Sequence, residues 1–197
     1  MTDLVASDSR QPPGSAPEPR LTAADYRRTP EGPPWFELVG GALLAEPSPT
    51  SWHQHASGEL FLELGLWCRR TGAGRVFAAP LDVYLSEHDV LQPDLLFIAR
   101  ERLTILREDG VHGPPDLVVE VLSPSNAVFV RTRKRAAYAY GRVPEFWLVD
   151  PKIAAVHVYD FERHPTIPVR FVGLGEALAS PRLPGFGMAV KELFRAR

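Results

Sequence analysis

Glu120 is an acidic residue in a stretch of sequence that is otherwise apolar. It lies inside Leu117–Leu122, a run that reads LVVEVL and is apolar on both faces, as in a central strand. Because an unpaired charge is costly to bury, such a carboxylate is usually kept for a partner or for chemistry. From the residues alone, Glu120 is either a ligand at a functional site or one half of a structural ion pair.

Asp94 and Lys134 are two further ionisable residues at informative positions. Asp94 directly precedes the apolar run Leu95–Ile98, so it is either a turn residue or an oxygen ligand at the mouth of the same sheet. Lys134 lies four residues before Tyr138, on the helix face that is expected to pack on the sheet. Its ammonium either neutralises Glu120, extends to the edge of that face, or takes part in chemistry.

Two carboxylates beside a lysine form a set of groups suited to phosphate chemistry. Carboxylate oxygens bind Mg²⁺ or Mn²⁺, which polarises a phosphate and lowers the pKa of a bound water. The ammonium can orient that water or stabilise the charge that builds up in the transition state. Asp94, Glu120 and Lys134 therefore indicate a metal-dependent phosphodiesterase. A metal-free hydrolase that uses two carboxylates, such as a glycosidase, is an alternative, but it leaves the lysine without a role.

The composition is that of one globular domain. The chain has 197 residues, of which 45% are hydrophobic and 23% are charged. A formal charge of −2 excludes binding to nucleic acid or lipid through a global positive field. Cys68 is the single cysteine, which excludes an intramolecular disulfide and a cysteine-rich zinc site. Without a membrane-spanning run or a secretory signal in the sequence, we expect a cytoplasmic protein and no membrane partner.

The first 20 residues differ in composition from the rest of the chain. They contain four prolines and no aromatic residue, which predicts a disordered tail over residues 1–20. Residues 21–197 are expected to form a single domain. Thr22 and Asp25 have the spacing of a capping box, so a short helix should begin there and end before Pro30.

The remaining pattern predicts an alternation of strands and helices. Gly40-Gly41 between two short apolar runs predicts a hairpin over residues 35–45. Apolar residues at helical spacing predict helices over 52–70, with Gly72 as the C-cap, and over 127–140. Strands are expected at 75–79, 81–85, 94–99, 117–122, 145–149, 154–159 and 168–172, with a helical turn near 191–194. This order predicts an α/β (α+β) fold with a mixed central β-sheet flanked by helices.

Several of these residues stand in motifs that resemble a known family. The motifs are Gln92-Pro93-Asp94, the run PDLVVEVLSPS at 115–125, Lys134 with Tyr138, and the run VPEFWLVDP at 143–151. In order and spacing they resemble the Uma-two family, whose members are described as putative restriction endonucleases of the PD-(D/E)XK nuclease superfamily. The resemblance covers about Leu21 to Tyr159. It implies a restriction-endonuclease-like core and cleavage of DNA that depends on Mg²⁺ or Mn²⁺.

The resemblance also implies roles for individual residues. Asp94 and Glu120 match the two acids that bind the metal. The superfamily usually has a lysine two residues after the second acid, where this chain has Leu122, and Lys134 on the following helix matches the relocated lysine of the family.

Two upstream residues match further family positions. Glu37 reaches the metal through water or is an exposed charge on the hairpin, and His53 is a weaker candidate that stands at a helix start.

Two positions depart from the family pattern. Val130 stands where the family usually has an aspartate four residues before the helix lysine, so one possible partner of Lys134 is missing. Arg142 stands where the family has a glycine. These departures leave a second hypothesis open, in which the chain is a catalytically weakened or inactive nuclease fold that acts as a nucleic-acid-binding or interaction module.

DNA is the expected partner, and three arginines on the second helix are candidate phosphate ligands. Arg131, Arg133 and Arg135 flank Lys134, and the guanidinium fork is suited to phosphate. The other interpretation of these arginines is a solvated helix face. A homodimer is the simplest arrangement for cutting both strands of a duplex, because two symmetric sites would then face the two strands.

Overall fold

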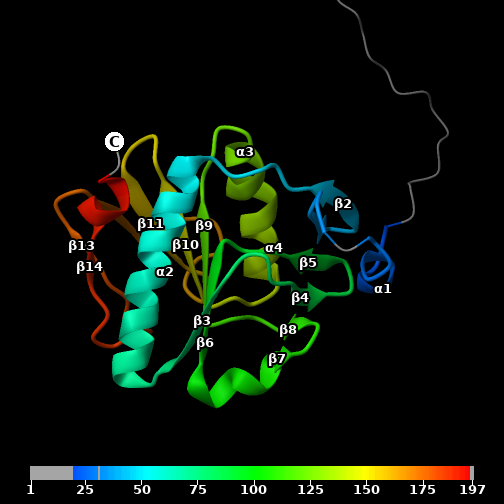
Figure 1. Ribbon diagram of the computed structural model, residues 1–197, viewed down its shortest axis with the longest axis horizontal. Helices are drawn as coiled ribbons and strands as arrows, with labels where there is room; N and C mark the ends of the chain where they lie inside the picture. Colours follow the sequence, from blue (N-terminus) through cyan, green and yellow to red (C-terminus); the bar gives the residue numbers. More distant parts are fainter. Residues whose placement is uncertain (1–19, 31, 196–197) are drawn as a thin grey trace, which may run out of the picture.

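A central mixed sheet organises the fold. The computed structural model describes residues 20–30 and 32–195. The sheet has six strands in the order β12-β11-β10-β9-β6-β3, and only β9 and β10 run parallel to each other. Its strands are β3 (Gly74–Ala78), β6 (Leu95–Ala99), β9 (Leu117–Val121), β10 (Glu145–Asp150), β11 (Ala155–Asp160) and β12 (Arg170–Gly173). The predicted fold class, a mixed sheet flanked by helices, is confirmed (Figure 1).

The connection between the two parallel strands is helical, as a parallel pair requires. It consists of α3 (Ala127–Phe129), a π-helical segment, η2 (Val130–Lys134), and α4 (Arg135–Tyr140). The Arg135 N–H reaches back to the Val130 carbonyl, five residues earlier, which marks the wider turn. The predicted helix over 127–140 is therefore present, with a π-turn that the apolar pattern does not reveal. Such turns are frequent at functional sites, and this one ends at Lys134.

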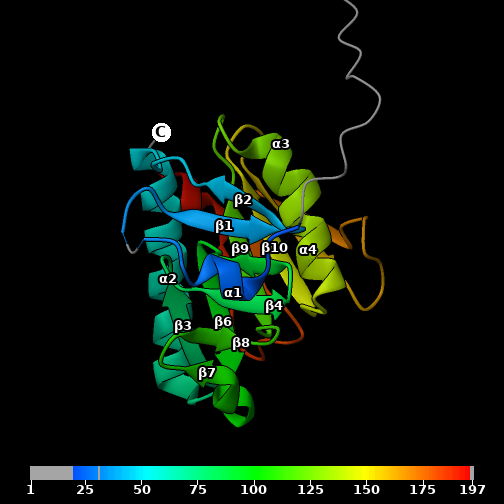
Figure 2. The same ribbon diagram turned by 90° about the vertical axis from the view of Figure 1, so that its right-hand side faces the viewer.

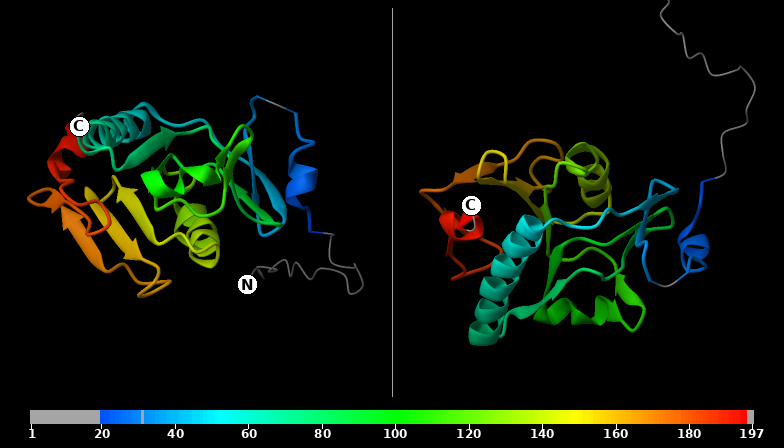
Figure 3. Two further views of the ribbon diagram at one scale, coloured as in Figure 1. Left: turned by 90° about the horizontal axis from the view of Figure 1, so that it is seen from below. Right: turned by 45° about the horizontal axis from the view of Figure 1, so that its top comes forward.

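The long helix α2 (Ser51–Thr71) covers the other face of the central sheet (Figure 1). The Thr50 hydroxyl accepts the His53 N–H at its start, and Gly72 ends it with a φ of 66°, so the predicted helix and its glycine cap are confirmed. Leu60, Leu64 and Trp67 are buried against the sheet. Beside α2 lies the C-terminal 3₁₀ turn η3 (Val190–Phe194), as Figure 3 shows.

A second sheet lies on the side of the helical connection. Its order is β2-β1-β5-β4-β8-β7, and its first two strands form the predicted hairpin. Gly40 and Gly41 both have positive φ, 60° and 82°, as a tight hairpin turn requires. The strands are β1 (Phe36–Val39), β2 (Ala42–Ala45), β4 (Val83–Ser86), β5 (Asp89–Leu91), β7 (Leu106–Arg107) and β8 (Gly110–His112). The sequence predicts β1, β2 and β4, but β5, β7 and β8 are too short to show the alternation of apolar and polar residues that marks a strand.

Smaller elements complete the fold. The capping box of Thr22 and Asp25 opens α1 (Ala23–Tyr26), as predicted, and α1 lies against the hairpin sheet (Figure 2). A 3₁₀ helix, η1 (Arg100–Ile105), follows β6, and β13 (Ala177–Leu178) pairs with β14 (Met188–Ala189). Residues 1–19 of the predicted tail lie outside the described residues.

Over 20–30 and 32–195, no helix is both long and apolar enough to cross a membrane. The cytoplasmic location stays a prediction.

The alternation of side chains along the central strands decides which face carries Glu120. Residues such as Phe97 and Val119 point to α2, whereas Leu96 and Val118 point to α4 and the hairpin sheet. Glu120 is two residues beyond Val118 and therefore shares its face. The carboxylate is thus buried between the central sheet, the helical connection and the hairpin.

His157 gives the fold a pH-dependent stability. It is buried on β11 with its ring 4.6 Å from that of Phe171. Burial and the charge of Arg131 lower the pKa of His157 below its usual 6.5, although Asp150 opposes them. A lowered folded-state pKa means that the unfolded chain binds the proton more readily, so stability present above pH 6.5 is lost as the pH falls.

We therefore expect the free energy of unfolding of His157→Gln to fall less steeply than that of the wild type below pH 6.5. Urea denaturation at several pH values measures this slope. His164→Asn, at an exposed position, is the control and should follow the wild type. Equal slopes for all three proteins would contradict the prediction.

Candidate active site

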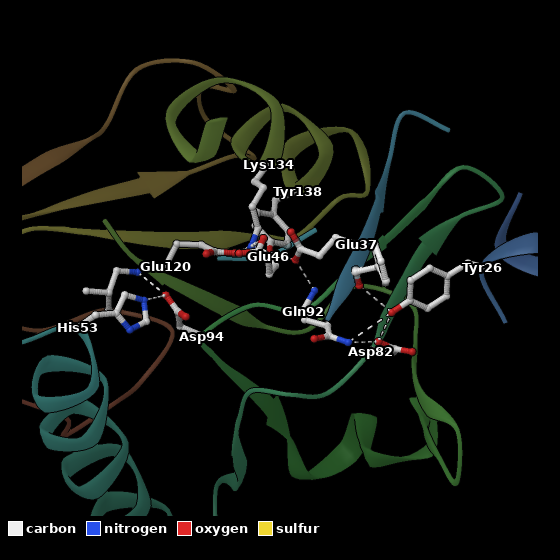
Figure 4. A network of polar contacts seen from close by, with 12 residues as sticks. Tyr26, Glu37, Glu46, His53, Asp82, Gln92, Asp94, Glu120, Lys134 and Tyr138 are labelled. Carbon is white, nitrogen blue, oxygen red and sulfur yellow. Dashed lines mark hydrogen bonds and ion pairs between the residues drawn. The ribbon is translucent and has the colours of Figure 1, made fainter. Parts of the chain in front are cut away.

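A buried lysine surrounded by three carboxylates forms the centre of the site (Figure 4). Lys134 Nζ lies 2.7 Å from Glu120 Oε1, 2.9 Å from Glu37 Oε1 and 3.6 Å from Glu46 Oε1. The side chain of Lys134 is only 2% exposed, and Glu37 is fully buried. We call these four residues the lysine cluster.

Four separate segments of the chain supply the lysine cluster. Glu120 comes from the middle of β9, and Lys134 comes from the end of the π-turn. Glu37 lies on β1, and Glu46 directly follows β2, so the hairpin supplies both of the other carboxylates. The cluster thus joins the central sheet, its helical connection and the second sheet.

Asp94 lies beside the lysine cluster, at the start of β6. The antiparallel pair Leu95 and Val119 places Asp94, one residue earlier, opposite Glu120, one residue later. Asp94 Oδ2 accepts the Val121 N–H at 2.6 Å and lies 3.0 Å from His53 Nε2, in the first turn of α2. These contacts fix the Asp94 carboxylate next to Glu120 (Figure 4).

Tyr138 and Gln92 donate hydrogen bonds that fix Glu120 and Glu37. The Tyr138 hydroxyl donates to Glu120 Oε1 at 2.6 Å, and the Gln92 N–H donates to Glu37 Oε1 at 2.6 Å. The Gln92 side chain donates in turn to Asp82 Oδ1, which also accepts the Tyr26 hydroxyl (Figure 4). The segment from Gln92 to Asp94 therefore links the second sheet to the central one and fixes acids in both.

Burial and neighbouring charges set the protonation of the three glutamates. Burial raises the pKa of Glu120 to about 7, although Lys134 opposes it. Burial and the nearby Glu46 carboxylate hold the pKa of Glu37 well above its usual value, again against Lys134. Burial also raises the pKa of Glu46, but the contacts from Glu37 and Lys134 outweigh it and lower the pKa.

Of this pair, Glu37 therefore takes up a proton more readily than Glu46. Its Oε2 is buried, and no donor among the described residues reaches it, so this oxygen is the position that suits the proton. That proton can be shared with the Glu46 carboxylate.

Lys134 and His53 keep their protons more firmly than usual. Burial alone would lower the pKa of Lys134, but Glu120, Glu37 and Glu46 raise it well above its ordinary value. Burial likewise lowers the pKa of His53, and the hydrogen bond that the ring donates to the Asp94 carboxylate more than offsets this. Lys134 is consequently an ammonium at neutral pH and cannot serve as a base.

A pocket of about 520 Å³ opens beside these groups. Its lining includes the polar residues Glu46, His53, Asp94, Glu120 and Lys134. Substrate can therefore approach the acids from this side. Trp35 and several prolines form part of the same lining.

The donor set fits a magnesium ion better than a zinc ion. Among the described residues, no group of three or more His, Cys, Asp or Glu side chains is arranged around a common metal position. Structural and catalytic zinc sites use at least three protein ligands. Mg²⁺ is commonly held by one or two carboxylates, with water and substrate oxygens completing the shell. Asp94 and Glu120, both lining the pocket, match this pattern.

The structure brings together most of the residues that the sequence singles out. Asp94, Glu120 and Lys134 lie at one place, with His53 on Asp94 and Glu37 on Lys134. Glu37 is buried in the lysine cluster and is not an exposed charge of the hairpin. The catalytic and metal-binding roles of these residues stay predictions.

The three arginines of the helical connection do not line this pocket. Arg131 pairs with Asp150, and Arg135 donates to the Pro165 carbonyl at 2.6 Å. Arg133 is exposed and lines a different hollow. Phosphate binding by these arginines stays a prediction, and it would take place away from the acids.

Glu46 and the role of Tyr138 escape sequence analysis. Glu46 stands between the hairpin and Pro47, where a charged residue signals only a turn. Its link to the site follows from the position of the hairpin over the helical connection. Val130 is buried among apolar residues, and the lysine cluster supplies Lys134 with three acidic partners in place of the missing aspartate.

Comparison with known proteins identifies a family and a similar fold. A family model, Uma2, described as "Putative restriction endonuclease", matches residues 23–191. The crystal structure of a putative nuclease belonging to DUF820 from Anabaena variabilis is similar, with a TM-score of 0.75 at 20% identity. The match covers 89% of this chain and 98% of that one, and it shows a shared fold. A search of curated proteins finds no match.

Removal of the Lys134 charge should destabilise the protein. In Lys134→Met the carboxylates of Glu46 and Glu120 lose their buried cation, and we expect the free energy of unfolding to fall by about 3–5 kcal/mol at pH 8. The loss should be smaller at pH 5, where the carboxylates take up protons. Urea denaturation measures both values. Lys152→Met, at an exposed position, is the control, and an equally small loss in the two variants would contradict the account.

Glu37→Gln should leave the stability nearly unchanged, because glutamine mimics a protonated glutamic acid as both donor and acceptor. We expect its free energy of unfolding to lie within about 1 kcal/mol of the wild type. Thermal or urea denaturation at pH 7 measures the change. A loss as large as that of Lys134→Met would show that Glu37 is charged in the folded protein.

Proposed function

The chain belongs to the Uma2 family, described as "Putative restriction endonuclease", and we propose that it is a Mg²⁺- or Mn²⁺-dependent DNA endonuclease that hydrolyses phosphodiester bonds. The observation that carries this proposal is that Asp94, just before β6, lies opposite Glu120 on β9, beside an open pocket and a buried lysine. The nuclease-like fold of the chain supports it.

The proposed metal ligands are Asp94 and Glu120. When bound there, Mg²⁺ or Mn²⁺ would polarise the phosphate and lower the pKa of a water. The protein's part is to hold both carboxylates in place before substrate arrives. Asp94 is held by the Val121 N–H and His53, and Glu120 is held through Oε1 by Tyr138 and Lys134. Neither of these contacts to Glu120 involves Oε2.

Lys134 acts in this proposal as a fixed positive charge. Its ammonium is enclosed by carboxylates, so it orients Glu120 and favours its ionised form against the effect of burial. It also places a positive charge at the pocket that receives the phosphate. His53 is a positioning residue that acts through Asp94.

A second candidate function is nucleic-acid binding without cleavage. The observation that favours it is the position of Arg131, Arg133 and Arg135 outside the acid pocket, together with Val130 in place of the family aspartate. Such a protein would bind DNA through phosphate contacts, with an affinity that falls steeply with salt. The homodimer expected for duplex cleavage stays a prediction.

Cleavage of plasmid and single-stranded DNA in Mg²⁺, Mn²⁺ or a chelator tests the proposal. We expect products only with metal, and we expect Glu120→Gln and Asp94→Asn to lower the rate by about 100-fold or more. Glutamine at 120 keeps an acceptor for Tyr138 and Lys134, so the variant should fold. Glu101→Gln, at an exposed position, is the matched control and should cleave like the wild type.

Cleavage in chelator, or full activity of Glu120→Gln, would contradict the proposal. A folded wild-type protein that binds DNA in a salt-dependent manner, but yields no products with either metal, would favour the binding module.

A further inference from the structure

Trp35 is a large apolar side chain that stays partly exposed beside the acid pocket. It is 43% exposed and lines both the acid pocket and a neighbouring hollow of about 740 Å³. Among the described residues, no aromatic ring stacks on its indole and no polar group bonds to it. A partly exposed aromatic residue therefore lies where the two hollows meet.

The backbone ties Trp35 to the lysine cluster. The Trp35 carbonyl accepts the Glu46 N–H at 2.8 Å, where the two strands of the hairpin end. The carboxylate of Glu46 lies 3.6 Å from Lys134 Nζ. Trp35 is consequently held near the acids by the hairpin that supplies Glu37 and Glu46.

The charges in the pocket limit how it can hold a nucleic acid. Its lining contains the acids Glu46, Asp94 and Glu120, and Lys134 is its one lysine or arginine among the described residues. The ammonium of Lys134 is already surrounded by carboxylates. His53, the other basic residue of the lining, is paired with Asp94. Away from the proposed metal, the pocket therefore offers phosphates little net positive charge. The affinity must come mainly from the uncharged lining, which includes five polar residues, Ser48, Gln54, Gln92, Ser123 and Asn126. Its apolar part is Ala79, the prolines Pro33, Pro34, Pro47, Pro49 and Pro80, and one aromatic ring, Trp35.

The neighbouring hollow provides a cation on the other side of Trp35. Arg27 lines it, with its guanidinium carbon 4.8 Å from the centre of the Tyr84 ring. Arg27 Nε lies 3.7 Å from Asp109, and both side chains are about half exposed. An exposed ion pair of this kind contributes little, so Arg27 can exchange it for a phosphate. Trp35 thus lines both the acid pocket and the hollow that Arg27 lines.

We propose that Trp35 stacks on an unpaired nucleobase next to the scissile phosphate, so that the substrate is single-stranded DNA or a strand unpaired at that nucleotide. In a duplex the faces of the bases are covered by their neighbours, and an indole reaches one only after the base has left the stack. Aromatic side chains that stack on bases beside a basic contact to the backbone are typical of single-strand binding. The position of the scissile phosphate in this inference rests on the proposed nuclease function.

Binding of short oligonucleotides to the Glu120→Gln protein tests the inference without cleavage. We expect tighter binding of a single strand than of the same strand in a duplex, with quenching of tryptophan fluorescence that is absent in Trp35→Phe. In the same background, Trp35→Ala should weaken single-strand binding roughly 5- to 150-fold, as expected for one stacked base, and leave duplex binding unchanged. Trp35→Phe should retain most of the affinity.

The control variant is Phe61→Ala on α2. Phe61 is 40% exposed, close to the value for Trp35, but it lies outside the acid pocket. It should bind single strands like its parent. Thermal melting confirms that each variant is folded, and Trp35→Phe keeps the test valid if Trp35→Ala is unstable. Binding of an RNA strand of the same sequence is measured as well. Because stacking recognises the base and not the sugar, we expect Trp35 to contribute to RNA binding too.

The outcomes separate this inference from the proposed nuclease function. Trp35-dependent binding of single strands, with no cleavage by the wild type in any metal, would support stacking and contradict the nuclease. Metal-dependent cleavage with equal single-strand binding by Trp35→Ala and its parent would overturn the inference alone. Binding of RNA but not of DNA would contradict DNA as the substrate.

Discussion

The ion cluster around Lys134 is the interaction on which the site depends. One buried ammonium holds carboxylates from β9, from β1 and from the end of β2, so three parts of the fold meet at a single charge. Each of these acids would be costly to bury alone, and together they would repel one another. Burial raises the pKa of Glu37, and a proton on this acid reduces the negative charge that the ammonium must balance. The lysine thereby makes it possible to keep Glu120 inside the sheet, next to Asp94.

This arrangement separates the tasks of the acidic residues. Glu37 and Glu46 balance and orient Lys134, whereas Asp94 and Glu120 border the pocket and are the proposed metal ligands. A lysine enclosed in this way cannot swing toward substrate, so we infer that it works by its charge and by holding Glu120. The hairpin links the two proposals, because it supplies Glu37 and Glu46 to the cluster and Trp35 to the pocket. If the protein cleaves a single DNA strand, one protomer is enough to form the complete site.

Much of the fold and of the site could be predicted from the sequence. Glu120 and Lys134 stand out because a charge breaks an apolar period, and Asp94 is found through its motif. Glu46 could not be found, because its role depends on how the hairpin lies over the helical connection, a long-range contact without a local signal. The π-turn that ends at Lys134 could not be predicted either, because it does not alter the pattern of apolar residues. The strands β5, β7 and β8 are too short to show an alternation of apolar and polar residues. Arg131, Arg133 and Arg135 are the opposite case. They lie beside Lys134 in the sequence, but they do not line the pocket.

The central claim is that Asp94 and Glu120 form one divalent-metal site beside Lys134. Titration of the wild-type protein with Mn²⁺, followed by the loss of the electron paramagnetic resonance signal of free Mn²⁺, tests it without any assumption about substrate. The account predicts one bound ion per chain in the wild type and its loss in both Asp94→Asn and Glu120→Gln. Undiminished Mn²⁺ binding by both folded variants, or no binding by the wild type, would contradict it.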